Sequence, residues 1–178
     1  ISKGLVGSEM CIRDRVYDRH KDLNAAFGQR YGWERPNWFA AKGQEPLNQY
    51  SFHTRRTNWF ERVGLEVLGT RERVALLDLT PFAKHEVSGP GAEAFLDSMV
   101  ANRLPKKKGG ITLAHALTPT GGVESEFTIT REDEDRFYLV SSGAAERHDH
   151  DLLLKNLPKD NSVKLVNKTM DLGTLVVC

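Results

Sequence analysis

The stretch that decides the fold is LLDLTPFAKHEVSGPGAEAFLDSM, which runs from Leu76 to Met99. It begins with two predicted strands separated by Pro81, because VALLDLT is apolar and FAKHEVSG alternates with the period of a strand. The Gly-Pro-Gly turn then predicts the start of a helix, since proline is tolerated in a first helical turn. Apolar residues recur at helical spacing from there to Val100. The stretch carries no evident nucleophile or metal-ligand cluster, so its side chains alone indicate no reaction.

The sequence that follows predicts a hairpin, further strands and a second helix. ITLAHALTPTGGVESEFTIT, residues 111–130, contains two alternating segments joined by a Pro-Thr-Gly-Gly turn. In the second segment Glu124 and Glu126 lie on one strand face, and Ser125 lies on the other. The segments RFYLVS, VKLVNKT and GTLVVC are predicted strands, and AAERHDHDLLLKNL is a predicted helix. This order predicts an α+β fold with a mainly antiparallel sheet packed by helices.

The N-terminal part of the chain predicts two helices and a connector. DRHKDLNAAFGQRYG has Leu23, Ala26 and Phe27 at helical spacing, with Asp18 as the N-cap and Gly32 as the end. WERPNWFAAKGQEPLNQY follows, and its aromatic residues favour an ordered connector over a mobile linker. SFHTRRTNWFERVGLEVLGTRER then predicts a helix with one broad apolar face, formed by Phe52, Trp59, Phe60, Val63 and Val67.

Both ends of the chain suggest a fragment. The chain starts at Ile1 rather than Met, and the strand-like GTLVVC has no turn after it. LVGSEMCIRDR, residues 5–15, resembles the translated read-through of a sequencing adapter, so residues 1–15 are set aside as an artefactual or disordered tail. An ordinary flexible tail is the alternative. In either case Met10 and Cys11 carry no functional weight.

Composition excludes several classes of function. The 178 residues include 25 Lys and Arg against 24 Asp and Glu, a formal net charge of +1. This balance lacks the basic footprint of a nucleic-acid-binding protein. No window approaches the ~18 consecutive apolar residues of a membrane span, so neither nucleic acid nor membrane is a predicted partner. Cys11 and Cys178 form no disulfide framework, which fits a reducing, cytoplasmic or matrix-like compartment.

Several polar groupings have structural interpretations that outweigh functional ones. In HDHD, residues 148–151, the two histidines lie about 200° apart on a helix, which favours a solvated helix face over a metal site. Lys106–Lys108 could attract a phosphate or a polyanionic tail, but an exposed loop is the commoner case. His85 and His115 fall on predicted strands and are interpreted as structural residues. No metal ligand is therefore predicted.

Glu126 is the most interesting acid. It lies in a strand just after a Gly-Gly turn, where an enclosed carboxylate could hold or deprotonate an amine. A lone strand Glu is also commonly just solvent-facing, so the residues by themselves leave Glu126 as a candidate.

The stretch LLDLTPFAKHEVSGPGAEAFL resembles the folate-binding aminomethyltransferase domain typified by the glycine-cleavage T-protein. GGVESEFTIT and DRFYLVSSGAAERHDHDLL resemble the segments that follow in that family. YGWERPNWFA and TNWFERVGLEVLGTRERVALLDLTPFAKHEV are similar to the linker and folate domain of dimethylglycine and sarcosine dehydrogenases, which are large flavoproteins. Together these segments cover most of Tyr17 to Val177.

The resemblance implies a division of the chain and a set of cofactors. Residues 16–50 would be a helix and aromatic linker from a preceding flavin domain, and residues 51–178 a folate-binding domain truncated at its C-terminus. Tetrahydrofolate would bind here, whereas FAD would belong to the flavin domain outside this chain. The implied partners are folate and a methylated amine. Flavin oxidation would make an iminium that a folate nitrogen attacks, giving methylenetetrahydrofolate and the demethylated amine, or formaldehyde if water reacts instead.

The resemblance also assigns site residues. The family's acid pair after the Gly-Gly turn corresponds to Ser125 and Glu126, so Glu126 is the implied catalytic residue and would shuttle a proton if its surroundings raise its pKa. Glu126, Ser125 and Ser142 are the implied folate-binding residues, and Ser142 replaces an Asn of the T-proteins. Three alternatives stay open: a free-standing aminomethyltransferase, a non-catalytic folate-binding or regulatory module, and an incomplete domain without activity. The implied location is the cytoplasm, or the mitochondrial matrix in a eukaryote.

Overall fold

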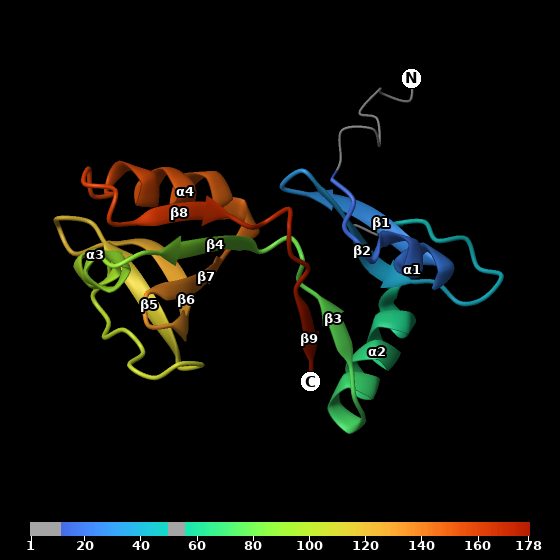
Figure 1. Ribbon diagram of the computed structural model, residues 1–178. Helices are drawn as coiled ribbons and strands as arrows, with labels where there is room; N and C mark the ends of the chain where they lie inside the picture. The colour runs from blue at the N-terminus through green and yellow to red at the C-terminus, as the bar shows by residue number, and fades with distance from the viewer. Residues whose placement is uncertain (1–11, 50–55) are drawn as a thin grey trace, which may run out of the picture. The chain divides into compact units, whose positions relative to one another are not determined.

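The computed structural model describes residues 12–49 and 56–178, which form two compact units (Figure 1). Unit 1 contains the described residues up to Thr80 together with Gly173–Cys178, and unit 2 contains Pro81–Leu172. Helices and mainly antiparallel strands occur in both units, so the predicted α+β class is confirmed.

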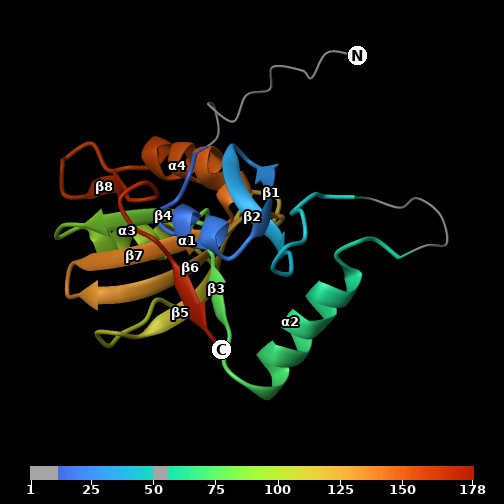
Figure 2. The same cartoon turned by 90° about the vertical axis from the view of Figure 1, so that its right-hand side faces the viewer.

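Unit 2 is built on a five-stranded sheet in which every neighbouring pair is antiparallel. The strand order is β5-β6-β7-β4-β8, and Figure 2 shows these strands side by side. The elements in chain order are β4 (Ala83–Ser88), α3 (Ala92–Met99), β5 (Ile111–Leu117), β6 (Val123–Asp133), β7 (Arg136–Ser141), the short 3-10 helix η2 (Gly143–Ala145), α4 (Glu146–Lys155) and β8 (Lys164–Asn167). The predicted hairpin, both predicted helices and the predicted strands are present.

The core of unit 2 lies on one face of this sheet. Side chains from both helices join the inner residues of the strands in one buried cluster, which includes Phe95, Leu96, Phe127, Ile129, Phe137, Leu139 and Leu153. Burying a side chain of this size stabilises the fold by about 1.5–3 kcal/mol. Because α3 and α4 both contribute to the cluster, they cover the same face of the sheet and leave the other face without a helix from this unit.

The Gly-Pro-Gly turn joins β4 to α3 as the sequence predicts. Gly89 has a φ of +115°, a conformation that L side chains rarely adopt. The N–H of Gly91 donates to the carbonyl oxygen of Ser162 at 3.1 Å, and that of Gly89 donates to the carbonyl oxygen of Asp135 at 2.9 Å. A Cβ on Gly89 would collide with the same Ser162 oxygen. This turn therefore requires glycine for its conformation and for its close backbone contact.

Unit 1 contains two short helices and two separate antiparallel strand pairs. Its elements are α1 (Tyr17–Asp22), β1 (Ala25–Arg30), β2 (Trp33–Phe39), α2 (Phe60–Glu72), β3 (Leu76–Asp78) and β9 (Leu175–Val177). β1 pairs with β2. The predicted strands VALLDLT and GTLVVC are present as β3 and β9, and the structure pairs them with each other.

The predicted helix from Asp18 to Gly32 is wrong beyond Asp22. Asn24 adopts a positive φ of 62°, and its side-chain amide donates to the carbonyl oxygens of Ala41 and Gln44 at 3.0 and 2.9 Å. This left-handed residue ends α1 and starts β1. Tertiary hydrogen bonds thus override a spacing that was equally compatible with a strand.

A β-hairpin takes the place of the rest of that helix. Tyr31 and Gly32 both have positive φ and form the two-residue turn between β1 and β2, as a type I′ hairpin requires. The predicted connector is accordingly a strand from Trp33 to Phe39, although its tryptophans are buried as predicted, Trp33 and Trp38 being 3% and 1% exposed.

The predicted helix around TNWFERVGLEVLG is confirmed as α2, but its apolar face is only partly buried. Trp59 and Val63 pack against the small buried cluster of Ala26, Trp38 and Ala40, whereas Phe60 and Val67 are exposed. Phe52 lies outside the described residues.

We expect Gly89→Ala to destabilise the chain by about 2 kcal/mol or more, because the new Cβ meets the Ser162 carbonyl and the backbone is strained. Gly109 is the matched control: it has a φ of +77°, and no atom lies within 4 Å of the position that a Cβ would occupy, so Gly109→Ala should cost only about 1 kcal/mol of strain. Urea unfolding followed by circular dichroism measures both. Equal losses would show that the contact with Ser162 does not contribute.

Candidate functional site

The predicted acid Glu126 lies on the face of the unit 2 sheet that α3 and α4 leave uncovered. It is exposed on β6, and its Oε2 forms a 2.9 Å hydrogen bond with Nε2 of His115 on β5. The two residues are direct cross-strand partners, and the backbone N–H of His115 is fixed by the side-chain oxygen of Asn102 at 3.0 Å. The structure therefore presents a carboxylate and an imidazole in contact, a pair that can accept and pass a proton.

Sequence reasoning missed His115, which it interpreted as a structural residue on its own. The signal was the register of the hairpin, since residues facing each other in an antiparallel pair have neighbouring side chains. The predicted turn alone did not fix that register, because a bulge between Ala116 and Leu117 shifts the pairing next to the turn.

Ser142 lies just after β7 and is exposed, and its Oγ accepts the N–H of Ala144 at 3.3 Å at the start of η2. The ladder between β6 and β7 includes the pair Thr128–Val140. Ser142 lies two residues beyond Val140, and Glu126 lies two residues before Thr128, so strand alternation assigns both to the uncovered face, beyond the last pair of the ladder. The structure thus supports a common location for two of the three implied folate-binding residues.

Ser125, the third implied residue, faces the other way. It is 7% exposed, and its Oγ donates to Oδ1 of Asp149 on α4 at 2.5 Å. The hydroxyl of Ser141 on β7 donates to Oδ2 of the same carboxylate, also at 2.5 Å. Ser125 is therefore held beneath the sheet, on the side that the helices cover, and does not share a face with Glu126.

The interpretation of HDHD as a solvated helix face is wrong for Asp149, which is fully buried, and for His150 in part. His148 and Asp151 are exposed as predicted. The missed signal is the spacing of Glu146, Asp149, His150 and Leu153, which are the positions i, i+3, i+4 and i+7 of one helix face. That face is mostly polar, and it packs against the sheet because the sheet supplies polar partners.

His85 on β4 is a buried histidine beside this polar helix face. Its ring stacks on the ring of His150, with centroids 5.3 Å apart and an interplanar angle of 20°. Neither ring nitrogen of His85 has a hydrogen-bond partner among the described residues. Burial, followed by the charge of His150, lowers the pKa of His85 below its ordinary value of 6.5, although Asp149 and Glu146 act in the opposite direction.

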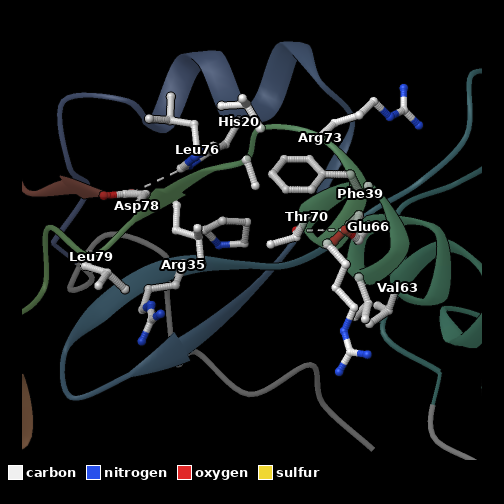
Figure 3. A pocket seen from close by; sticks show the side chains of 17 residues that line it. His20, Arg35, Phe39, Val63, Glu66, Thr70, Arg73, Leu76, Asp78 and Leu79 are labelled. Carbon is white, nitrogen blue, oxygen red and sulfur yellow. Dashed lines mark hydrogen bonds and ion pairs between the residues drawn. The ribbon is translucent and has the colours of Figure 1, made fainter. Parts of the chain in front are cut away.

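Unit 1 contains a pocket of about 730 Å³ lined by α2, β2 and β3 (Figure 3). Phe39, Val63 and Leu76 give it apolar walls, and the side chains of His20 and Asp78 also line it. The sequence does not predict this pocket, since its lining residues come from segments far apart in the chain.

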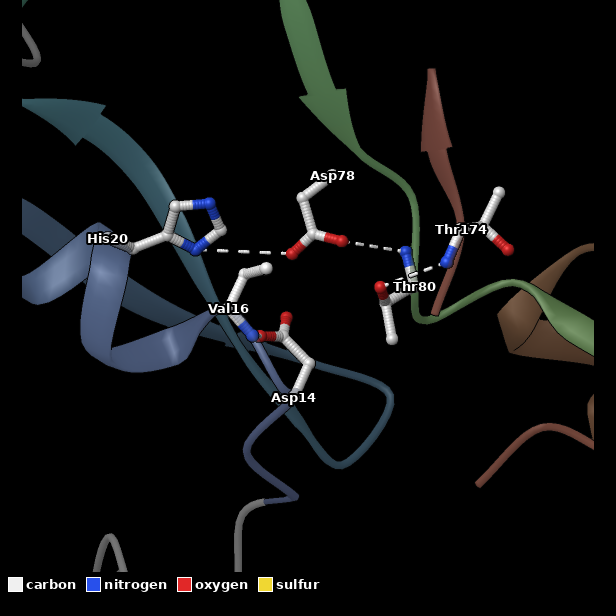
Figure 4. Close-up of polar contacts among 6 residues, drawn as sticks. All are labelled: Asp14, Val16, His20, Asp78, Thr80 and Thr174. Atoms are coloured by element: carbon white, nitrogen blue, oxygen red, sulfur yellow. Dashed lines mark hydrogen bonds and ion pairs between the residues drawn. The ribbon is translucent and has the colours of Figure 1, made fainter. Parts of the chain in front are cut away.

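His20 and Asp78 lie beside Asp14 in a small polar cluster (Figure 4). One ligand atom from each lies within 4.8 Å of the others, and Nδ1 of His20 is 3.9 Å from Oδ2 of Asp78. Burial and the Asp78 carboxylate raise the pKa of Asp14 to about 6. Burial alone would raise the pKa of Asp78 too, but hydrogen bonds from Asp14 and Thr80 hold it below 3.8. Asp14 falls in the segment set aside by the sequence analysis.

The loop Lys106–Lys108 is exposed, as the sequence predicts, and Lys108 pairs with Asp133 at 3.4 Å. Within the described part of the chain, no helix has both the length and the apolar character that crossing a membrane requires.

A comparison with protein families matches residues 16–178 to the GCVT N-terminal domain. The chain belongs to this family. A solved structure, the glycine cleavage system aminomethyltransferase T from Bartonella henselae, matches with a TM-score of 0.69 at 23% identity. The match covers 88% of this chain and 38% of that one, and it supports the resemblance in fold.

Relatives of known name match the chain over a small part of their own length. Human mitochondrial dimethylglycine dehydrogenase is 38% identical over 157 residues, which are 88% of this chain and 18% of that protein. The 4-methylaminobutanoate oxidase (formaldehyde-forming) of Paenarthrobacter nicotinovorans is 33% identical over 165 residues, or 93% and 20% of the two chains. Human mitochondrial sarcosine dehydrogenase is 24% identical over 201 residues, which are 93% of this chain and 22% of that protein. The chain thus spans about a fifth of the length of these relatives and is related to the predicted dehydrogenases.

We expect the contribution of His85 to the stability of the chain to fall as the pH is lowered through 6.5, while Asp14, whose pKa is raised to about 6, acts in the opposite direction. The pKa of His85 is lower in the folded state, so the unfolded chain binds more protons in this range and gains stability from acid. Urea unfolding between pH 7.5 and 5.5 measures the slope. His85→Gln should flatten it, whereas His148→Gln, on the exposed side of α4, should leave it unchanged. An unchanged slope in His85→Gln would assign the pH dependence to other groups.

Proposed function

We propose that this chain binds a reduced folate on the uncovered face of the unit 2 sheet, as part of an enzyme that transfers one-carbon units. The observation that carries the proposal is the contact between Glu126 and His115 on that face. Membership of the GCVT N-terminal domain family supports it.

The residues of this face fit the chemistry of a pterin ring. A carboxylate accepts hydrogen bonds from the ring's amino and N–H groups, and a serine hydroxyl can donate or accept one. Leu113, two residues before His115 on β5, is exposed and supplies apolar surface for a flat ring. When bound, tetrahydrofolate would supply the nitrogen that takes up a one-carbon unit. Glu126 would accept a proton there, and His115 would orient its carboxylate.

The whole protein would be a dehydrogenase for a methylated glycine such as dimethylglycine or sarcosine. The relatives named as dimethylglycine dehydrogenases and sarcosine dehydrogenase support this class of substrate. The chain lacks the Gly-rich motif of a dinucleotide site, so FAD would be held by a preceding flavin domain, with residues 16–50 as the link to the folate domain of residues 51–178. The mammalian relatives are named mitochondrial, which fits a mitochondrial matrix location in a eukaryote and the cytoplasm otherwise.

A non-catalytic module is the second candidate. The pyruvate dehydrogenase phosphatase regulatory subunit of the mouse is 30% identical over 157 residues, or 86% of this chain, so relatives in this range include a protein named for regulation. In that case the face would bind folate or another ligand without a chemical role for Glu126.

The test of folate binding is calorimetric titration of tetrahydrofolate, kept under anaerobic conditions, into the chain. We expect saturable binding that Glu126→Gln weakens by about tenfold, since a charged acceptor is lost. Glu124→Gln is the matched control, because Glu124 is exposed on the same strand and should change the dissociation constant by less than about twofold.

Two results would contradict the proposal. One is the absence of binding by a chain that circular dichroism shows to be folded. The other is an equal effect of the Glu126 and Glu124 variants. It would mean that the two carboxylates only add negative charge to this surface and that Glu126 makes no specific contact with the ligand. Binding that is unaffected by Glu126→Gln would favour the non-catalytic module.

A further inference from the structure

We propose that Asp149 is a positioning residue that sets the spacing between Glu126 and Ser142 on the opposite face of the sheet. This inference rests on the proposed function for its link to folate. It rests on the hydrogen bonds of Asp149 for its geometry.

The two serines bound by Asp149 immediately precede the two residues of the uncovered face. Ser125 comes just before Glu126 on β6, and Ser141 comes just before Ser142 at the end of β7. Side chains alternate along a strand, so fixing one residue from below fixes the direction of the next one above. The carboxylate of Asp149, on the side of the sheet that the helices cover, therefore orients both Glu126 and Ser142.

The backbone pairing explains why such a tie is needed at this point. The ladder between β6 and β7 includes no pair beyond Thr128–Val140 toward the folate site. From there β6 continues along β5, and β7 continues along β4. In the described structure, the link from Ser125 through Asp149 to Ser141 bridges the two strands where the ladder no longer does.

The carboxylate itself is held in place from two further strands. On the same face of α4, Glu146 accepts a 2.9 Å hydrogen bond from the amide of Asn167 on β8, and His150 stacks on His85 of β4. The groups that face Asp149 from the sheet are thus the two serines and His85. Contacts with β4 and β8 hold α4 in place, so the hydrogen bonds of Asp149 hold β6 and β7 at a fixed position relative to that helix.

A buried carboxylate suits this role better than an apolar side chain. Burying a charge is unfavourable unless it is hydrogen bonded, so the arrangement is stable only while both serines donate to it. Apolar contacts tolerate small displacements, whereas two short hydrogen bonds to one carboxylate fix distance and direction. Leu153, one turn along the same face and also fully buried, supplies the apolar part of the packing.

The experiment is a mutant cycle on the full chain, with the dissociation constant of tetrahydrofolate as one measurement. The variants are Asp149→Asn, the double variant Ser125→Ala with Ser141→Ala, their combination, and Leu153→Ala as a control that loosens α4 without touching either serine. The second measurement is amide hydrogen exchange at Glu126 and Ser142, compared at equal global stability by adjusting urea. It requires no ligand.

We expect Asp149→Asn and the double serine variant each to weaken folate binding by about tenfold. Their combination should be no worse than either one, because both break the same link. Exchange at Glu126 and Ser142 should rise in these variants and not in Leu153→Ala. If Asp149→Asn or the double serine variant does not fold, the single variants Ser125→Ala and Ser141→Ala, each of which leaves the carboxylate one hydrogen bond, give the same test.

Three outcomes would overturn the inference. Additive effects of the Asp149 and serine variants would show that they act independently. An equal loss of affinity in Leu153→Ala would reduce Asp149 to a packing residue, and unchanged exchange at both positions would do the same. If the folded native chain binds no folate, the proposed function fails, while the exchange measurement still decides whether Asp149 positions the two residues.

Discussion

The one-sided cover of the unit 2 sheet is the constraint on which the rest of the structure depends. Helices α3 and α4 bury one face in a single apolar cluster, and strand alternation then assigns every second side chain to the other face. Glu126 is exposed and His115 is half-buried on this face because Phe127 and Ala114, their neighbours along each strand, are buried on the other. The candidate site is thus a consequence of core packing, and a one-residue slip of β6 would exchange Glu126 for Ser125.

The sequence predicts this sheet well and predicts its cross-strand contacts poorly, for a physical reason. Alternation is a property of one strand, so the exposure of Glu126 could be inferred from VESEFTIT alone. Contact with His115 depends on a register that the bulge beside Leu117 modifies, and no single strand carries that information. The same limit applies to Asp149. Its partners, Ser125 and Ser141, lie 24 and 8 residues before it on two different strands, so no local pattern links the three residues.

The failures in unit 1 have a related cause. The spacing of Leu23, Ala26 and Phe27 fits a helix, but hydrogen bonds from Asn24 to residues 16 to 20 positions later fix a left-handed residue there. Likewise, His20 and Asp78 meet through tertiary structure only. Where local pattern and long-range contacts agree, as in the Gly-Pro-Gly turn, prediction succeeds; where they differ, the long-range contacts decide.

The face of α4 that packs against the sheet is mostly polar, which favours a fixed orientation of the helix over the largest burial of hydrophobic surface. An apolar face would bury more hydrophobic surface, and such replacements of buried ionic groups are often neutral or stabilising in other proteins. Glu146, Asp149 and His150 instead place three ionisable groups against the sheet, with only Leu153 fully buried as an apolar residue. Each of the three reaches a different strand or pair of strands, so together they fix the orientation of the helix relative to β4, β6, β7 and β8. A helix held this way can fix the positions of side chains on the uncovered face of the sheet. Apolar contacts, which tolerate repacking, would fix those positions less closely.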